Sequence, residues 1–235
     1  MTLKDDIAGL INTVIGESWD IRDGRTIPDV ESVALRGGAV RIKACILFTD
    51  LVASSQLTEN FQKRTAAKIY KAFLAVATRI ATNNGGTITA FDGDRMMAAF
   101  VGDKMCEKAT KTAMQLTWAM NELVRPALRR HFESLQAVGF DISHCSGLDV
   151  GELFVVKAGN RSANDLVWVG KATNLAARLS EVRIDEKTLI SIAVYNELPD
   201  WLKKKGDAHI WTQYAIEFAG QRQECGKTTY YIDID

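Results

Sequence analysis

An Asp-Gly pair, Asp92-Gly93, stands between two short apolar runs, Thr87–Phe91 and Asp94–Val101. Both residues tolerate the backbone of a tight two-residue turn, so such a pair between apolar runs is the strongest local signal for a β-hairpin. The pair therefore predicts two adjacent antiparallel strands in the middle of the chain. The rest of the domain has to fold around them.

Apolar patterns before and after this hairpin predict a strand and two long helices. The short run Lys43–Thr49 is apolar and bounded by Gly and Asp, as a buried strand is. A long helical pattern comes after it and ends at Asn83–Gly86, where two glycines stop the helix. A second helical pattern covers about residues 103–131, and Pro126 is expected to kink or end that helix.

The remaining segments complete a mixed fold. Residues 140–157 are expected to form a second hairpin that turns near Gly151, and strand Leu166–Val169 leads into helix Lys171–Glu181. Strand, helix, hairpin, helix and strand in this order predict the α+β class, with a ferredoxin-like β-α-β-β-α-β core. We expect its helices to pack on one face of an antiparallel sheet.

The first 40 residues differ in pattern from the rest of the chain. Residues 1–20 carry apolar side chains at helical spacing, and the next segment contains Pro28 and several glycines. The sequence therefore predicts an N-terminal helix and extended arm over 1–40, before a single domain over 41–235. The arm is either a packing appendage or a surface for a partner.

Composition excludes several classes of protein. Of 235 residues, 47% are hydrophobic and 25% charged, as in ordinary globular domains. The 29 basic residues only balance the 29 acidic ones, so we expect no nucleic-acid partner. The four cysteines form no CxxC pair and the three histidines do not cluster, which argues against zinc and favours buried thiols. With no secretory signal and no apolar run of about 18 residues, we expect a cytoplasmic protein without a membrane partner.

Two aspartates are candidate metal ligands. Asp50 stands where the first buried strand ends and a helix follows, a turn that suits a phosphate or a divalent cation. Asp94 follows the hairpin turn and falls beside Asp50 if the two central strands are neighbours. Two adjacent carboxylates repel each other unless cations lie between them, and paired cations about 3.5–4 Å apart typically activate an attacking oxygen. Taken singly, each residue also has an ordinary role: Asp50 can cap the helix, and Asp94 can be a polar turn residue.

Asn174 and Arg178 are candidate catalytic residues. They are four residues apart, so they project from the same face of one helix, whereas Leu175 and Leu179 bury the opposite side. Arg178 could neutralise charge on a pentavalent phosphorus, and Asn174 could orient a ribose. An ordinary amphipathic helix would also place polar residues there.

Four segments, FTDLVASS, GGTITAFDGDRMMAAF, GLDVGELFVV and VGKATNLAARL, occur in the order and spacing of the class III nucleotidyl cyclases. Residues 41–235 therefore resemble a class III catalytic domain. The resemblance implies that Asp50 and Asp94 bind two divalent cations, Mn²⁺ or Mg²⁺, with Leu51 adding a backbone contact. It implies that Asn174 and Arg178 stabilise the transition state of a nucleoside triphosphate, whose ribose 3′-oxygen attacks the α-phosphate and releases pyrophosphate. It also implies a head-to-tail homodimer with shared active sites.

The base-reading positions depart from the purine cyclases of this family. Ala90 stands where those enzymes carry a Lys or Glu, and Val167 where they usually carry Asp, Thr or Cys. Neither side chain can hydrogen-bond a purine edge, so selectivity for that base should be lost. The chain also resembles the pyrimidine cyclases of bacterial Pycsar anti-phage systems, in its size, its Pro-Asp arm and the stretch Asn164–Gly170. That resemblance implies UTP, favoured over CTP, as substrate, and cUMP or cCMP as a signal to a separate cyclic-nucleotide effector.

Other functions remain open. An adenylate or guanylate cyclase could read its base through Asp92, Asp165 or Trp168. The Asp92-Gly93-Asp94 stretch is superficially like the loop of diguanylate cyclases, although the helix with Asn174 argues against them. A catalytically dead nucleotide-binding module is a further alternative. Lys171 and Lys227 are candidate contacts for the triphosphate, and both could equally be solvated surface residues.

Overall fold

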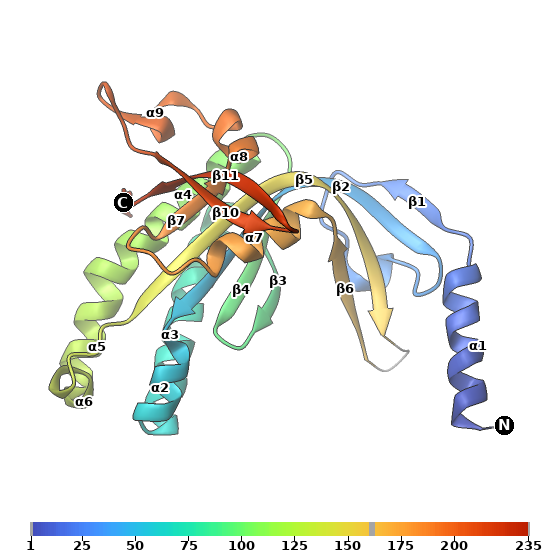
Figure 1. Cartoon of the computed structure of the whole chain (residues 1–235), viewed down its shortest axis with the longest axis horizontal. Helices are drawn as coiled ribbons and strands as arrows, with labels where there is room; N and C mark the ends of the chain where they lie inside the picture. Colours follow the sequence, from blue (N-terminus) through green and yellow to red (C-terminus); the bar gives the residue numbers. More distant parts are fainter. Residues whose placement is uncertain (1, 160–162, 235) are drawn as a thin grey trace.

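A computed structural model describes residues 2–159 and 163–234 (Figure 1). Within this part of the chain, a nine-stranded sheet has the order β10-β11-β7-β5-β2-β4-β3, with β1 added beside β2 and β6 beside β5. The strands of the sheet are β1 (Asp20–Asp23), β2 (Gly38–Val52), β3 (Thr87–Asp92), β4 (Arg95–Phe100), β5 (Ser143–Gly159), β6 (Asn164–Val169), β7 (Thr188–Ser191), β10 (Thr212–Phe218) and β11 (Gln221–Thr228). A separate two-stranded ribbon is formed by β8 (Lys204–Lys205) and β9 (Ala208–His209).

Helices precede, connect and cover these strands. In chain order they are α1 (Leu3–Gly16), the 3₁₀ turn η1 (Val30–Ser32), α2 (Ser54–Asn60), α3 (Lys63–Asn83), α4 (Met105–Ala119), the π-helical turn η2 (Met120–Val124), α5 (Arg125–His131), α6 (Glu133–Ala137), α7 (Lys171–Ser180), α8 (Ile192–Glu197) and α9 (Asp200–Lys203). None of the described helices is both long and apolar enough to cross a membrane.

The predicted β-α-β-β-α-β core is confirmed by β2, α3, β3, β4, α4 and β5. The pairs β2–β4, β3–β4 and β2–β5 are antiparallel, whereas β5–β7 and β1–β2 are parallel. The central hairpin is present, and its two-residue loop is Gly93–Asp94 because Asp92 still pairs with Arg95. Gly93 adopts a φ of 60°, which a glycine adopts without steric cost. The predicted turn is therefore displaced by one residue.

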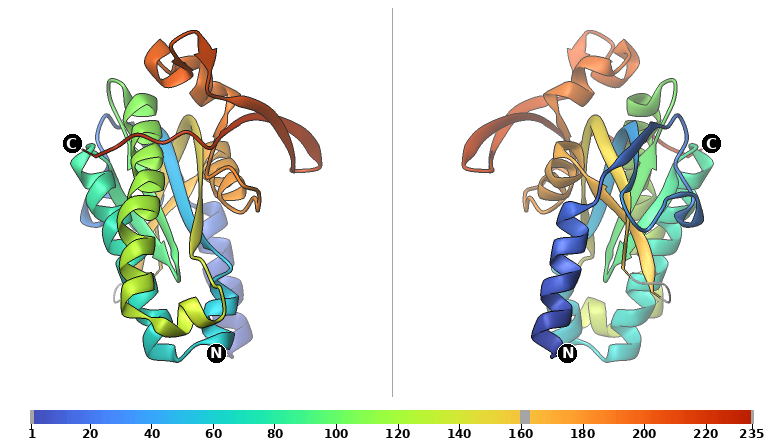
Figure 2. Two further views of the ribbon diagram at one scale, coloured as in Figure 1. Left: turned by 90° about the vertical axis from the view of Figure 1, so that its left-hand side faces the viewer. Right: turned by 90° about the vertical axis from the view of Figure 1, so that its right-hand side faces the viewer.

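Side chains along β2 alternate between two cores, as the period of two in a strand requires. Leu47 and Leu51 point toward α3 and α4 and pack with Phe73 in the larger core. Ile42 and Ile46 point to the opposite face, into a second core. Figure 2 shows α3 and α4 together on one side of the sheet.

The prediction that the helices pack on one face is incomplete, because α7 lies on the other. Ala172 and Ala176 of α7 belong to the second core with Ile46, and Val33 from the arm joins them. Buried strands with apolar side chains on both faces need cover on both. The helix carrying Asn174 thereby lies on the same face of the sheet as Asp50.

The predicted hairpin over 140–157 is wrong. Ser143–Gly159 is one continuous strand, β5, and it pairs antiparallel with β6, so the connection between them falls outside the described residues. Gly151 lies in mid-strand, and a Cβ there would meet Ala172 of α7 at 3.4 Å. A Cβ at that distance makes an ordinary contact, so this glycine neither forms a turn nor is required by the packing of α7.

The long helix expected over 103–131 does not end at Pro126, but a π-helical turn interrupts it directly before that proline. It consists of α4, the π-helical turn η2 and α5, and Pro126 stands in the first turn of α5. Pro126 has no N–H to donate to the carbonyl of Glu122 in η2, which is the local disruption that a proline causes inside a helix. The predicted N-terminal helix is present as α1, none of whose residues is buried, and it stands apart from the other helices (Figure 1). All four cysteines are free and buried, as predicted.

Candidate active site

The site begins with two carboxylates at the paired ends of β2 and β4. Asp50 pairs with Arg95 across these strands, and Asp94 directly precedes Arg95 in the hairpin loop. Asp50 is only 6% exposed. The Oδ2 atom of Asp94 is buried and has no hydrogen-bond partner among the described residues. Because β2 and β4 are neighbours, the structure brings Asp50 and Asp94 to one corner of the sheet, as expected for that arrangement.

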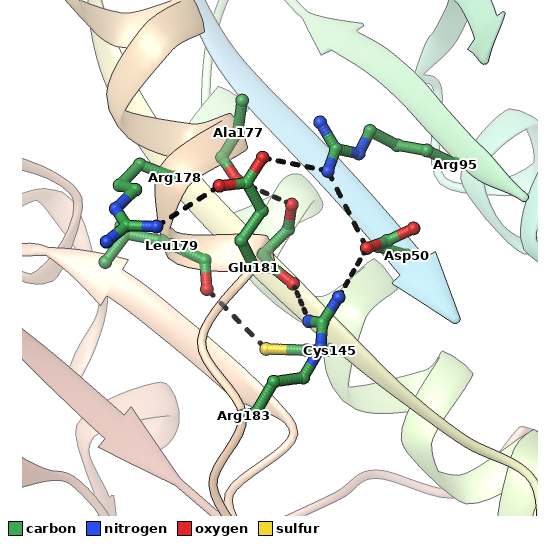
Figure 3. A network of polar contacts seen from close by, with 9 residues as sticks. Asp50, Arg95, Cys145, Ala177, Arg178, Leu179, Glu181 and Arg183 are labelled. Atoms are coloured by element: carbon green, nitrogen blue, oxygen red, sulfur yellow. Dashed lines mark hydrogen bonds and ion pairs between the residues drawn. The ribbon is translucent and has the colours of Figure 1, made fainter. Parts of the chain in front are cut away.

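Two guanidinium groups surround the carboxylate of Asp50 (Figure 3). Arg183 Nη2 donates a hydrogen bond of 2.8 Å to Asp50 Oδ2, and Arg95 Nη2 lies 3.7 Å from the same oxygen. Arg95 also donates to Glu181 Oε1 at 3.0 Å and lies over the ring of Phe48. The buried negative charge of Asp50 is therefore compensated by positive charge from β4 and from the segment after α7.

Opposing influences act on the protonation of Asp50. Burial raises the pKa of this carboxyl above its ordinary value, because the charged form is poorly solvated there. The hydrogen bond from Arg183 lowers the pKa, and the negative charge of Asp94 raises it again. The influence of Asp94 reflects the closeness of the two carboxylates.

The residues at this corner fit divalent cations. Carboxylate oxygens are the preferred ligands of Mg²⁺ and Mn²⁺, and Asp94 Oδ2, which is buried and has no partner in the described chain, is free to contact a cation. The side chain of Leu51 points into the helix-covered core, so this residue can offer only its backbone. Among the described residues, no group of three or more His, Cys, Asp or Glu side chains could hold a metal ion. Further ligands would therefore come from the substrate and water.

Asn174 and Arg178 are exposed on α7, whose position depends on a glycine. Gly147 of β5 faces the helix, and a Cβ there would collide with Ala176 O, Ser180 N and Leu179 Cβ. Arg178 Nη1 donates to Glu181 Oε2 at 3.3 Å, and Glu181 also accepts from Arg95. Figure 3 shows this chain of contacts from Arg178 through Glu181 and Arg95 to Asp50. Asn174 takes no part in it.

Two relatives, both uridylate cyclases, align with nearly the whole chain. The one from Rhodovulum sp. strain MB263 is 34% identical over 234 residues, which cover 98% of each chain. The one from Xanthomonas perforans is 36% identical over 212 residues, which cover 90% of each chain. The chain belongs to the uridylate cyclase family. It is thus a nucleotide cyclase, a phosphorus–oxygen lyase.

Solved structures place this cyclase in the class III fold. The guanylyl cyclase Cya2 superimposes with a TM-score of 0.68 at 18% sequence identity, over 81% of the present chain and 93% of Cya2. At this identity the likeness shows the fold alone. No protein-family model matches the chain.

The two positions predicted to face the base, Ala90 and Val167, lie on different strands. Ala90 on β3 pairs with Met97, which points to the face covered by α7. Val167 on β6 is 44% exposed and alternates with the buried Trp168, so the two neighbours point in opposite directions. Ala90 therefore faces the side of the sheet that α7 covers, whereas Val167 points away from the core that holds Trp168.

A cavity of about 510 Å³ separates β3 from β6 in the cyclase. The arm lines it through Thr26–Val30, together with Thr87–Thr89 of β3 and with Asp165 and Trp168 of β6. Trp168 Nε1 is buried and has no hydrogen-bond partner among the described residues. A polar group is therefore available near the edge of this cavity.

Sequence reasoning missed three charged residues of the cyclase site and named two lysines that have other partners. Arg95, Glu181 and Arg183 form the network around Asp50, and only Arg95 had a local signal, its place directly after Asp94. Lys227 pairs with Glu186 at 2.8 Å, and Lys171 donates to the Gln223 side chain.

Proposed function

We propose that this cyclase converts a pyrimidine nucleoside triphosphate, UTP in preference to CTP, into the 3′,5′-cyclic monophosphate and pyrophosphate. The observation that carries the proposal is the pair of carboxylates at the ends of β2 and β4, with Asp94 Oδ2 buried and without a hydrogen-bond partner in the described part of the chain. The uridylate cyclases that resemble the chain over 90–98% of its length support UTP as the substrate.

In the proposed mechanism, each group of the chain has a separate task. Asp50, Asp94 and the backbone of Leu51 hold two divalent cations, Mn²⁺ or Mg²⁺. Such cations, when bound, neutralise phosphate charge and make the ribose 3′-hydroxyl a better nucleophile. Arg178 places its guanidinium at the α-phosphate, where negative charge grows in the transition state, and Asn174 orients the ribose. Arg178 and Asn174 are exposed in the single chain, as residues that serve a partner's substrate should be.

The base preference follows from the loss of polar readers. Ala90 and Val167 offer no donor or acceptor side chain to a purine edge. A second candidate is an adenylate or guanylate cyclase with non-standard base recognition. It is favoured by Trp168, whose buried indole nitrogen has no partner among the described residues and which lines the cavity together with Asp165.

The wider setting belongs to the same proposal. The cyclase domain over 41–235 forms a head-to-tail homodimer with shared active sites, and the helix and arm over 1–40 flank it. Four free, buried cysteines fit a reducing cytoplasm. The cyclic nucleotide then acts on a separate effector in anti-phage defence. No nucleic acid or membrane takes part, in keeping with the zero net charge.

The test of substrate is a product assay. The purified full chain is incubated with ATP, GTP, CTP and UTP separately, with Mn²⁺, and the products are identified by mass. We expect cUMP from UTP, less cCMP from CTP, and no turnover after Asp50→Asn or Asp94→Asn. cAMP or cGMP as the main product would contradict the pyrimidine proposal and favour the purine cyclase.

The shared site is tested by mixing two inactive variants, Asp50→Asn and Arg178→Ala. In a head-to-tail dimer, each mixed dimer contains one site whose aspartates and Arg178 are all intact. Random pairing makes half the dimers mixed, so about a quarter of wild-type activity should return. Each variant mixed with itself is the control. No recovery, despite mixed dimers shown by mass, would contradict the shared site.

A further inference from the structure

Arg183 contacts Asp50 from a segment that carries no assigned function. This segment follows α7 and precedes β7. Arg183 Nη1 donates to the carbonyl oxygen of Ser180 at 2.9 Å. Its Nη2 donates to Asp50 Oδ2 at 2.8 Å. One edge of the guanidinium is thus anchored on the end of α7, and the other edge occupies an oxygen that a cation would need.

The two arginines at Asp50 differ in what holds them. Arg95 keeps Glu181 as a second acidic partner at 3.0 Å and has a side chain only 23% exposed. Among the described residues, Arg183 forms no ion pair except with Asp50, and its side chain is 43% exposed. When Asp50 binds a cation, Arg183 therefore becomes an unpaired positive charge at the mouth of the site, whereas Arg95 does not.

An exchange of partners is physically easy at Arg183. Partly exposed ion pairs contribute little net stability, so this contact is cheap to break. A divalent cation at Asp50 repels the neighbouring guanidinium, and a triphosphate attracts it. The planar guanidinium donates two parallel hydrogen bonds to phosphate oxygens as well as to a carboxylate.

We infer that Arg183 exchanges Asp50 for the substrate: it holds Asp50 in the metal-free chain and binds the β- and γ-phosphates once Asp50 holds a cation. The inference rests on the proposed function. It assigns the triphosphate contact to the subunit that supplies Asp50 and Asp94, not to the partner that supplies Arg178. It also gives the departing pyrophosphate a cationic partner.

The test uses Arg183→Gln in the full chain and two binding measurements. The first is Mn²⁺ affinity without nucleotide, followed by the spin-resonance signal of free Mn²⁺. We expect it to rise about five- to tenfold, because the competing cation is gone. The second is the affinity for pyrophosphate with saturating Mn²⁺, measured by calorimetry. We expect it to fall about tenfold or more, because a charged bidentate contact is lost.

The opposite signs separate exchange from a structural role. If the substitution only damaged the site, both Mn²⁺ and pyrophosphate would bind more weakly. If Arg183 had no role at the site, neither affinity would change. Either result overturns the inference. Arg222→Gln is the matched control, since Arg222 forms an exposed pair with Glu224 at the same 2.8 Å, and it should change neither affinity. If Arg183→Gln does not fold, Arg183→Lys is measured instead. We expect its Mn²⁺ affinity to rise and its pyrophosphate affinity to fall, each by less than in Arg183→Gln.

The readouts also separate this inference from the proposed function. If the wild-type chain makes no cyclic pyrimidine nucleotide, the proposed function is wrong. The affinities for Mn²⁺ and pyrophosphate still test the role of Arg183 in that case. If cUMP is made and the two affinities of Arg183→Gln equal those of wild type, the inference fails and the function stands.

Discussion

Gly147→Ala should separate the activity of this cyclase from its fold. Gly147 lies in β5 opposite Phe48 and faces α7, the helix that carries Asn174 and Arg178. A Cβ at this position would lie 2.6 Å from the Cβ of Leu179, and closer still to two backbone atoms of α7. Backbone atoms cannot rotate away as a side chain can, so the whole helix has to move.

The size of the effect follows from these distances. Carbon atoms in contact lie about 3.5–4.0 Å apart, so α7 must shift outward by about 1 Å. Overpacking of this kind costs about 1–3 kcal/mol, which lowers the melting temperature by roughly 2–4 °C per kcal/mol in a domain of this size. A displacement of about 1 Å at catalytic groups costs about 100-fold in rate. Activity should therefore suffer far more than stability.

The assay compares the melting temperature and kcat/KM of Gly147→Ala with those of Gly151→Ala. Gly151 lies on the same face of the same strand, but a Cβ there meets Ala172 at an ordinary 3.4 Å. We expect Gly151→Ala to keep kcat/KM within about twofold of wild type, since the strand and helix need not separate. Wild-type kcat/KM in folded Gly147→Ala would refute the view that this contact sets the position of Arg178.

Three groups outside that contact give further tests. Burial lowers the pKa of His144 to about 3, so below pH 6.5 protons bind preferentially to the unfolded chain. Relative to His144→Gln, the free energy of unfolding by urea should fall by about 2 kcal/mol between pH 6.5 and 5. Asp94→Asn should abolish cyclisation without lowering the melting temperature, because it neutralises a carboxylate whose buried Oδ2 has no partner among the described residues. Deleting residues 2–16 should shift the melting temperature by less than about 1 °C, because α1 buries none of its residues.

Local patterns predicted most elements of the fold. The Asp92-Gly93 pair, flanked by apolar runs, predicted the central hairpin to within one residue. Helical spacing predicted α3, and the strand before Gly170 predicted the start of α7. These signals succeed because turn chemistry and side-chain period act between residues close in the chain.

Glycine shows where local reasoning stops. Gly151 suggested a turn, yet it lies inside β5, and the expected hairpin over 140–157 is a single strand. A missing Cβ permits either a turn or the close approach of another element. At Gly151 it is the unbroken pairing of β5 with β2, through Ala44, that excludes a turn.

The candidate site also combines features that the sequence predicts with features that only tertiary packing decides. Local patterns placed Asp50 at the end of a strand and Asp94 in a hairpin turn, but the pairing of β2 with β4 that brings them together joins residues about 45 apart in the chain and is decided by the tertiary structure. Helical spacing likewise placed Asn174 and Arg178 on one face. No local pattern indicated the contact between Arg183 and Asp50, which are 133 residues apart. Such a contact depends on where α7 ends against β5 and on the charge that burial leaves uncompensated at Asp50, and both are decided only when distant segments pack together.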